Sequence, residues 1–536
     1  MDQTTSPGPS NVSSRWALGL LLVAMVVVSA VRWRLLDVPL ERDEGEYAHA
    51  GALMLDGFAP YERAYNMKWP GIYAAYAGLM SVFGETHRGI HQGLLLVNLL
   101  TMLFVFLLGR ATIDEWVGAV AAAIYGMFSL TPPVQGLFAN AEHFVLLLAL
   151  PGLLLLLKSG RSERILWLVP GALLLGCGLV VKQHGLFLAA FGGLVAMFGV
   201  RPHGVRPVLQ RAGLFSLAVV TPYLLTCLGL WIAGVFDVFW FWTFDYARAY
   251  LGQVPWDVAP KLFLKTAGPL FLAASMAWVF ALLGLISPIW FRPARRRGWF
   301  LTGLAAFSAL SICPGLYFRG HYFVLLLPAA ALLSAVGIRA LAASVVHGTR
   351  PAGVTAVILV TSVLSCGQVL WSSRQYLFEL TPTEVARATY GLNPFPESLV
   401  VADFIRNSTE STASIAVVGS EPQIYFYSKR PPASSYMYTY PLVEAQPFNR
   451  RMQDEFIREI EESQPQALVF VQFKSSWLAS AEAPTRVFRW LSGYLRAFEL
   501  ALVVESGDSG ARVHEGEALA RFRDQTNEGL YVYLRR

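Results

Sequence analysis

Repeated apolar segments, each close to the length of a membrane-crossing helix, dominate the first 372 residues of the chain. A helix needs about 20 apolar residues to cross a bilayer, and only helices and closed barrels satisfy their backbone there. The composition agrees, because 55% of the residues are hydrophobic and 15% are charged, whereas soluble domains are about a quarter charged. The sequence therefore predicts an α-helical polytopic membrane protein with about eleven spans. The expected spans lie near residues 15–33, 89–109, 115–130, 137–157, 165–181, 184–200, 212–234, 263–290, 299–314, 321–338 and 352–371.

Basic residues fall on alternate loops between these segments, as in the run Arg295-Arg296-Arg297, while the other loops are poor in Lys and Arg. The positive-inside rule places the basic loops in the cytoplasm. The N-terminus is then cytoplasmic, and the loop 32–88 and everything after the last span lie outside. The net charge of +6 is explained by this orientation, so no nucleic-acid partner is expected.

Three regions are predicted from the change in composition along the chain. Residues 1–14 are polar and form a disordered cytoplasmic tail, and residues 15–372 form the transmembrane domain with its outer loop 32–88. From about residue 373 the charge rises and the apolar runs shorten, which indicates an external α/β domain over 373–536. Its expected strands are Ile415–Gly419, Ala467–Phe473, Phe498–Glu505 and Leu530–Leu534, with a helix over Arg451–Glu462.

Four carboxylates, Glu41, Asp43, Glu44 and Glu46, crowd together directly after the first apolar segment. Charges are costly in hydrocarbon, and those kept at the membrane are usually functional. Asp43 followed by Glu46 fits a helix start, with Asp43 as the N-cap and Glu46 reaching back from the third position. Glu44 adds a carboxylate that capping does not need, so capping and catalysis are both open for Asp43.

A second acidic site, Glu142, opens the segment near 137–157 on the same predicted side of the membrane as Asp43. A catalytic role competes here with that of a solvated acid favoured by the helix dipole. The adjacent His143 is more often a satisfied polar residue than a metal ligand.

Three cations lie at predicted outer boundaries. Snorkelling to lipid head groups is an alternative for both Lys68 and Lys182, and for Lys182 it is the favoured interpretation. The position of Lys68 is better defined, because the fixed turn Trp69-Pro70-Gly71 follows it. Arg319 can donate two parallel hydrogen bonds to a phosphate, or anchor a span among aromatic neighbours. Carboxylates facing a lysine at the membrane edge point to chemistry on a phosphate-bearing lipid.

Several other motifs are missing from the sequence. It contains no P-loop, no GxGxxG in a strand–helix context and no HExxH, and its four cysteines lack metal-ligand spacing. An ATP-driven pump, a disulfide framework and a zinc site are therefore not expected.

The motifs of the first outer loop and of two later segments recur together in one group of enzymes. They are Asp43-Glu44-Gly45-Glu46-Tyr47-Ala48, Asp56-Gly57, Tyr61, Asn66-x-Lys68-x-Pro70-Gly71-x-Tyr73, Asn140-Ala141-Glu142, Arg319-x-His321-Tyr322-Phe323 with Pro328, and Ile415–Tyr427. Together they resemble membrane glycosyltransferases of the GT-C fold. Within this fold they look most like the bacterial protein O-mannosyltransferase-like group, with lipid A aminoarabinose and lipopolysaccharide-core galacturonic acid transferases as relatives. Trp69 stands where a proline is commoner.

The resemblance implies transfer of a hexose or pentose from a polyprenyl-phosphate donor to a lipid, glycan or protein acceptor, with inversion. It places the reaction on the outer side of the cytoplasmic membrane, among membrane lipids. Asp43 is implied as the base that takes the acceptor's hydroxyl proton, with Glu44 beside it. Lys68 and Arg319 are implied to stabilise the phosphate leaving group, and Glu142 to hold the acceptor or Asp43.

The same resemblance implies further residues at the site. Lys182 joins the residues that bind the donor phosphate. The residues implied for the acceptor or lipid groove are Glu46, Tyr47, Tyr61, Asn66, His143, His321 and Tyr322. Some relatives hold a divalent metal near these carboxylates, which this sequence neither requires nor excludes.

Two other functions compete with this one. A transporter or flippase of lipid-linked sugars should carry charges mid-span or in broken helices of matched halves, whereas the distinctive charges here lie at one face. A binding or assembly protein that acts through its outer domain would leave the cluster around Asp43 unexplained.

Overall fold

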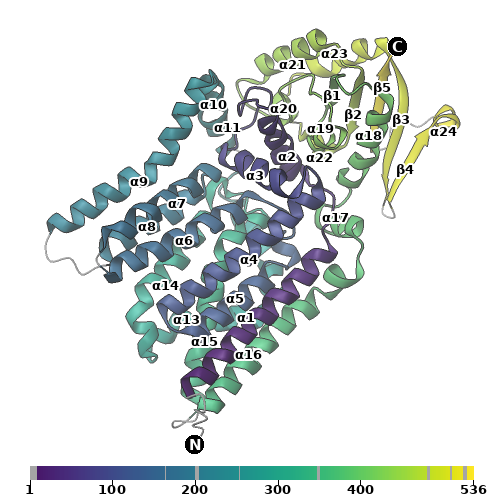
Figure 1. The fold of residues 1–536 in the computed structure, drawn as a ribbon. Coiled ribbons are helices and arrows are strands. Elements are labelled where there is room, and N and C mark those ends of the chain that lie inside the picture. The colour runs from purple at the N-terminus through teal and green to yellow at the C-terminus, as the bar shows by residue number, and fades with distance from the viewer. Residues whose placement is uncertain are drawn as a thin grey trace, which may run out of the picture. The chain divides into compact units, whose positions relative to one another are not determined.

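The computed structural model describes residues 9–162, 164–199, 205–252, 254–346, 351–479, 483–507, 510–522 and 528–536. Of the expected tail 1–14, residues 1–8 lie outside this part, and helix α1 begins at Pro9. The chain forms two compact units, each built from three segments (Figure 1). The first unit holds the chain up to Leu35, Gln92–Thr226 and Val254–Glu379, and the second holds Leu36–His91, Cys227–Gln253 and Leu380–Arg536.

The first unit is helical, and the first residues of α4 and the last of α9 are assigned to the second unit. Its α-helices are α1 (Pro9–Arg34), α4 (His87–Thr112), α5 (Glu115–Phe128), α6 (Ala141–Ser162), α7 (Leu168–Val181), α8 (Gly185–Phe198), α9 (Val205–Ile232), α12 (Ala259–Ala273), α13 (Ser275–Ile286), α14 (Arg292–Ser311), α15 (Leu327–Val345) and α16 (Pro351–Ser372). Short 3₁₀ or π turns are η1 (Pro132–Val134), η2 (Ile165–Trp167), η4 (Ser287–Ile289), η5 (Pro314–Leu316), η6 (Gly320–Leu326) and η7 (Gln375–Glu379).

In the described part, six helices are long and apolar enough to cross a membrane, or seven if the bent pair α12–α13 is one span. Shorter apolar helices lie at Glu115–Phe128, Ile165–Val181 and Gly185–Phe198, where further spans are expected, and at Gly71–Phe83. The predicted class, a helical polytopic membrane protein, is therefore confirmed, while the count of eleven spans stays a prediction.

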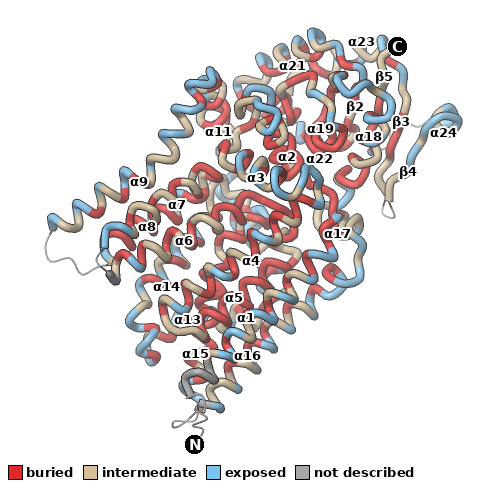
Figure 2. The backbone as a smooth tube through the Cα atoms, viewed as in Figure 1, coloured by how far each residue is buried: buried red, intermediate tan, exposed pale blue. Residues whose placement is uncertain are grey.

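Helix α5 forms the centre of the first unit, packed against α1 and α15. Every residue from Trp116 to Phe128 is buried, whereas much of α9 is exposed (Figure 2). Small residues let neighbouring helices approach closely. A Cβ added at Gly118 would lie 2.4 Å from the carbonyl oxygen of Phe106, so the crossing of α4 and α5 depends on this glycine.

The expected span near 263–290 is not one straight helix. It consists of α12 and a second helical stretch, Ser275–Ile289, which are bent by 99° relative to each other. Ala274 leaves the helical region there, and the side chain of Gln368 accepts from the backbone N–H of Met276 at 2.9 Å and donates to Ser275 Oγ at 2.6 Å. These hydrogen bonds satisfy polar groups at the break in the helix, because the hydrocarbon of a membrane offers them no hydrogen-bond partners.

The second unit joins helices to one five-stranded sheet. Its helices are α2 (Arg42–Leu55), α3 (Gly71–Phe83), α10 (Phe236–Trp240), the π-helix η3 (Phe241–Tyr246), α11 (Ala247–Leu251), α17 (Pro382–Tyr390), α18 (Phe395–Ser408), α19 (Gln423–Ser428), α20 (Tyr440–Val443), α21 (Asn449–Ser463), α22 (Lys474–Trp477), α23 (Arg486–Tyr494), η8 (Leu495–Ala497) and α24 (Glu517–Arg521). The strands are β1 (Ile415–Val418), β2 (Ala467–Gln472), β3 (Phe498–Gly507), β4 (Gly510–Glu515) and β5 (Gly529–Arg535), in the order β1-β2-β5-β3-β4.

The sheet is mixed, and helices cover both of its faces (Figure 1). β1 and β2 are parallel, with Val417 opposite Val469, and all other neighbouring strands are antiparallel. Alternate residues of a strand point to opposite faces. Ala416 and Val418 accordingly pack in the core with α21 and α23, while Ile415 and Val417 pack with α18. This confirms the expected C-terminal α/β fold.

Candidate active site

Helix α2 of the second unit begins with the acidic cluster, but its cap is Glu41. The Glu41 carboxylate accepts from the backbone N–H groups of Asp43 at 3.0 Å and Glu44 at 3.2 Å, and Glu44 Oε2 accepts from the backbone N–H of Glu41. The predicted capping by Asp43 with Glu46 is therefore wrong, because the capping box starts two residues earlier. Burial, together with the charges of Asp43 and Glu44, raises the pKa of Glu41 well above its usual range.

Asp43 does not cap the helix, and its side chain instead contacts Lys68. Lys68 Nζ lies 3.2 Å from Asp43 Oδ2 and 3.4 Å from the hydroxyl oxygen of Tyr47. The side chains of Lys68 and Asp43 are 20% and 12% exposed, so both remain within reach of a ligand. The sequence expectation of a carboxylate facing this lysine agrees with this geometry.

The segment that carries Lys68 is fixed from within. The Tyr61 hydroxyl donates to the carbonyl oxygen of Lys68 at 2.6 Å, and Tyr61 itself has a φ of 68°, a left-handed conformation that is costly for a tyrosine. Asn66 is buried, and its Oδ1 accepts from the backbone N–H of Met67 at 2.6 Å. No described residue pairs with its Nδ2. The lysine is therefore held by a strained, internally bonded loop.

Glu44 and His91 form a buried pair behind Asp43. His91 Nε2 lies 3.0 Å from Glu44 Oε1, and His91 Nδ1 lies 2.9 Å from the carbonyl oxygen of Leu36. Both ring nitrogens of His91 therefore face oxygen atoms, which fixes the orientation of the ring. His91 escaped the sequence prediction because it lies within an apolar segment; the only signal was the cost of an ionisable residue there.

Glu46, like Glu44, is a fully buried carboxylate of the cluster. Its Oε1 accepts from the Tyr73 hydroxyl at 2.7 Å, while Oε2 has no hydrogen-bond partner among the described residues. Burial raises the pKa of Glu46 to about 7, with Lys68 opposing the rise and Asp43 adding to it. Such a group can give or take a proton near neutral pH.

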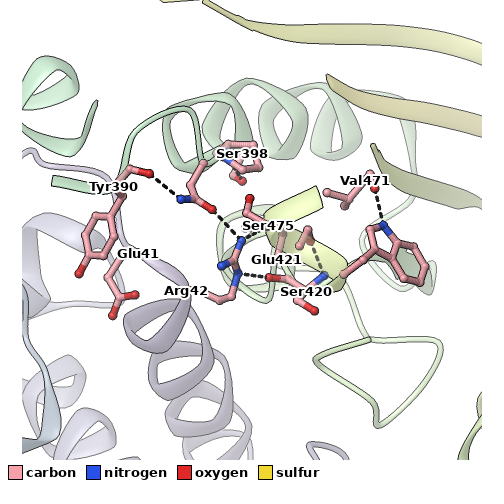
Figure 3. Close-up of polar contacts among 12 residues, drawn as sticks. Glu41, Arg42, Tyr390, Ser398, Ser420, Glu421, Val471 and Ser475 are labelled. Atoms are coloured by element: carbon pink, nitrogen blue, oxygen red, sulfur yellow. Dashed lines mark hydrogen bonds and ion pairs between the residues drawn. The ribbon is translucent and has the colours of Figure 1, made fainter. Parts of the chain in front are cut away.

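The start of α2 is anchored to two segments of the C-terminal region within the same unit. Arg42 Nη2 lies 2.5 Å from Glu421 Oε1 and 3.1 Å from Asn393 Oδ1, and Arg42 Nε donates to the carbonyl oxygen of Ser420. Figure 3 shows Arg42 directed towards Glu421 and Ser420. A Cβ on Gly45 would lie 2.7 Å from the backbone nitrogen of Gln423, so α2 needs a glycine where α19 crosses it.

In the first unit, Glu142 and Lys182 form a second pair. Lys182 Nζ lies 2.5 Å from Glu142 Oε1 and 4.7 Å from the centroid of the Tyr322 ring. Both charged side chains are buried, and Lys182 ends α7 just before α8 begins. A lysine that snorkelled to head groups would be exposed, so the snorkelling interpretation of Lys182 is wrong.

Buried polar atoms without partners surround the start of α6. Both side-chain polar atoms of Asn140, both ring nitrogens of His143, and Glu142 Oε2 have no hydrogen-bond partner among the described residues. Buried Arg32 holds the loop before α6 through the carbonyl oxygen of Gly136, at 2.9 Å. Unsatisfied buried groups are costly, and their clustering marks a place where a ligand or water supplies the missing hydrogen bonds.

Arg319, His321 and Tyr322, from the sequence motif that precedes α15, also lie in the first unit. Tyr322 packs edge-on against His184, with ring centroids 4.7 Å apart, and His321 Nδ1 lies 3.1 Å from Gln135 Oε1. Arg319 is exposed, with its guanidinium 5.4 Å from the ring of Tyr317. Tyr322 thus contacts both His184 and Lys182, and Arg319 contacts the ring of Tyr317.

A divalent metal does not fit the described residues as they stand. They contain no group of three or more His, Cys, Asp or Glu side chains arranged to hold a metal ion. Three of the four carboxylates at α2 contact different side chains, namely Lys68, His91 and Tyr73, and Glu41 caps the helix.

The chain is similar to known proteins in both sequence and fold. Residues 68–225 match the family of dolichyl-phosphate-mannose-protein mannosyltransferases, a match that begins at Lys68 and includes Glu142 and Lys182. None of the curated protein sequences matches the chain.

Solved structures extend the similarity over nearly the whole chain. ArnT from Cupriavidus metallidurans, bound to undecaprenyl phosphate, is 17% identical with a TM-score of 0.56, covering 92% of this chain and 97% of that one. The oligosaccharyltransferase AglB from Archaeoglobus fulgidus, in complex with an inhibitory peptide and a dolichol-phosphate, is 11% identical with a TM-score of 0.53, covering 94% and 74%. The chain thus has the GT-C fold, and the resemblance carried by its motifs is confirmed.

Proposed function

We propose that the protein transfers a sugar from a polyprenyl-phosphate donor to an acceptor hydroxyl at the outer face of the cytoplasmic membrane, with inversion. The observation that carries this proposal is the partly exposed pair of Asp43 and Lys68, a base and a cation 3.2 Å apart. Support also comes from the fold shared with a protein solved with undecaprenyl phosphate and from the matched mannosyltransferase family.

In this mechanism the pair separates when the donor binds. The donor phosphate takes over Lys68, which leaves the Asp43 carboxylate without its counter-ion and therefore more basic. Asp43 removes the proton of the acceptor hydroxyl, and that oxygen forms a bond to the anomeric carbon. The bond between the anomeric carbon and the phosphate oxygen breaks at the same time, with Lys68 stabilising the charge that develops on the phosphate.

The other groups around α2 support this step. Glu44 is held by His91 and keeps the first turn in place through the capping box. Glu46, Tyr47, Tyr61 and Asn66 are proposed to shape the acceptor or lipid groove. Because one oxygen of Glu46 has no described partner, it can accept a hydrogen bond from an acceptor hydroxyl.

The buried pair of Glu142 and Lys182 is proposed to serve the same reaction from the first unit. Lys182 is a candidate for binding phosphate, and the orphaned atoms of Asn140 and His143 are candidates for binding sugar or phosphate oxygens. We keep Arg319 as a further phosphate-binding candidate because its guanidinium is exposed.

One observation favours a second function, transport of a lipid-linked sugar. The ionisable pair Glu142–Lys182 is buried, and Lys182 lies where α7 ends and α8 begins, and broken helices with buried charges are typical of transporters. A transporter moves the intact donor and leaves its glycosidic bond unbroken, so the products separate the two functions.

The test uses the purified full chain in nanodiscs with radiolabelled undecaprenyl-phosphate hexoses and pentoses and a crude envelope acceptor fraction. Transfer predicts release of free undecaprenyl phosphate together with label in the acceptor. Translocation of an intact labelled donor in proteoliposomes, without release of undecaprenyl phosphate, would establish the transporter instead.

A further inference from the structure

The second unit contains a cavity of about 640 Å³ that the proposed transfer step does not use. Its walls come from all three segments of the unit: the loop before Lys68, helices α10 and η3, and the region of Tyr436 with helix α21. Ligand pockets commonly have volumes of roughly 300–1,000 Å³ and combine aromatic walls with a few polar groups.

Four aromatic side chains form one wall of this cavity: Tyr65, Phe241, Trp242 and Tyr436. The Tyr65 ring lies 5.8 Å from Trp242 and meets Tyr436 edge-on at 5.4 Å, and Trp242 meets Tyr436 edge-on at 5.8 Å. Trp242 and Tyr436 are buried, whereas Tyr65 and Phe241 are half-buried. The buried rings therefore set the positions of the two rings that are more accessible.

Charged groups of both signs line the rest of the cavity. Arg451 places its guanidinium 4.4 Å from the centre of the Phe241 ring, and Glu455 Oε2 accepts from the Tyr436 hydroxyl at 2.9 Å. Asp237 and Asp454 are exposed at the same cavity, together with Arg458. Three carboxylates against two arginines leave no excess of positive charge, which disfavours a phosphate or another polyanion.

The helix that carries two of the aromatic residues is itself unusual. Phe241–Tyr246 is a π-helix, inserted between α10 and α11. Such segments are rare and occur frequently at functional sites. Here the insertion lies at Phe241 and Trp242, the two residues that α10–α11 contributes to the aromatic wall.

We propose that this cavity binds an uncharged saccharide, namely the glycan portion of the acceptor. A sugar ring has a face of C–H groups that packs on the electron-rich faces of aromatic rings. Its hydroxyls donate to carboxylates and accept from guanidinium N–H groups, which matches the mixed charges of Asp237, Glu455 and Arg451.

The cavity also shares a segment with the reaction site. Tyr65 lies three residues before Lys68, and its backbone N–H donates to the carbonyl oxygen of Ser435 at 2.7 Å, beside Tyr436. A saccharide held against Tyr65 therefore contacts the same loop that carries Lys68. The acceptor role rests on the transfer reaction proposed above, whereas saccharide binding itself does not.

The test measures binding without the donor. The purified full chain in nanodiscs is applied to an array of neutral di- to hexasaccharides of mannose, galactose, glucose and arabinose, and the affinities of positive probes are measured by calorimetry. We expect binding of at least one family of these saccharides. Arg451→Ala should weaken it about tenfold, by loss of a cation that packs on Phe241. Asp237→Trp, which fills the cavity from an exposed position, should abolish it.

Matched controls lie beside the test residues. Arg450 precedes Arg451, is exposed and does not line the cavity, and Asp245 is an exposed residue of η3 outside it. Arg450→Ala and Asp245→Trp should bind saccharide as the wild type does, and thermal melting of all four variants shows whether they fold.

Two results would overturn the proposal: no bound saccharide, or binding by Arg451→Ala and Asp237→Trp that equals binding by the wild type. Donor turnover on the same preparation separates the two proposals. Saccharide binding without donor turnover would contradict the proposed transfer reaction but support the saccharide site. Donor turnover without saccharide binding would support the transfer reaction and contradict the saccharide site.

Discussion

Asp43 Oδ2 and Lys68 Nζ lie 3.2 Å apart, on a helix start and a loop that other residues hold in place. This arrangement suits the proposed step in which an anionic ligand replaces Asp43 as the ionic partner of Lys68.

Because Glu41 caps α2, the role of Asp43 can be tested without loss of the cap. Asp43→Asn should leave thermal stability nearly unchanged and slow the chemical step by roughly 10²–10⁴-fold, since an amide cannot take up the acceptor's proton. Single-turnover release of undecaprenyl phosphate measures this step. Glu41→Ala is the counterpart, which should lower stability by about 0.5–2 kcal/mol through loss of the cap. Normal turnover by Asp43→Asn would move the base to another carboxylate.

For Lys68, we expect Lys68→Ala to slow turnover about a hundredfold, because a charge that stabilises the developing phosphate is lost. Lys68→Arg should retain part of the activity. Lys474→Ala is the matched control, since Lys474 is an exposed lysine of the same unit. Steady-state turnover of undecaprenyl-phosphate sugar by the three variants gives the comparison, and wild-type rates for Lys68→Ala would exclude a catalytic role.

Glu46 predicts a pH dependence of stability. Its pKa is raised by burial from 4.5 to about 7, so the folded state holds the proton more tightly than the unfolded state. This contribution to stability is complete below about pH 4.5 and is lost as the pH rises through 7, by up to about 3 kcal/mol at 1.36 kcal/mol for each pKa unit.

Thermal unfolding of wild type and Glu46→Gln between pH 5 and 8 measures this effect. The glutamine variant, which cannot ionise, should lose less stability over that range than the wild type. Glu62→Gln, at an exposed position, should follow the wild-type curve. Parallel curves for wild type and Glu46→Gln would show that the pKa of Glu46 is not raised in the folded state.

The buried pair in the first unit predicts a stability effect larger than that of a helix-start acid. Glu142→Gln leaves the buried ammonium of Lys182 without its counter-ion and should destabilise the protein by about 3–5 kcal/mol, against about 0.3–1 kcal/mol for a dipole effect alone. Glu142→Gln/Lys182→Met should recover most of the loss. A folded double variant that remains slow in donor turnover would support a role in transfer, whereas normal turnover would make the pair purely structural.

Orientation is predicted by the basic loops. Reporter fusions after Arg297 should be active as cytoplasmic reporters, and fusions after Arg374 as external ones. A cytoplasmic signal after Arg374 would contradict the outer-face reaction proposed for the chain.

Much of the architecture could be predicted because length and hydrophobicity decide it. Apolar stretches such as Ile415–Gly419 and Ala467–Phe473 became the strands β1 and β2. The strand β4, Gly510–Glu515, was missed because it lies at the edge of the sheet and has no continuous apolar run. Local patterns cannot reveal a strand that is defined mainly by its neighbour.

The candidate site was only partly predictable for the same reason. Asp43 and Lys68 belong to one loop motif, and their proximity followed from it. Glu142 and Lys182 each had a sufficient local explanation, at a helix start and at a membrane edge, so nothing in the sequence indicated that they pair. Glu41 was overlooked as a cap because Glu is a rare N-cap compared with Ser, Thr, Asp and Asn.

The anchoring of Arg42 to Ser420 and Glu421 has a consequence for how such enzymes can be recombined. A chimaera that exchanged only the C-terminal region at a single junction would remove the hydrogen-bond partners of Arg42. The Arg42 side chain, which is only 15% exposed, would then lack its carboxylate. The graft that preserves the site is discontinuous: Leu36–His91, Cys227–Gln253 and Leu380–Arg536 have to be exchanged together. If the second unit binds the acceptor as proposed, a change of acceptor specificity therefore requires the exchange of all three segments.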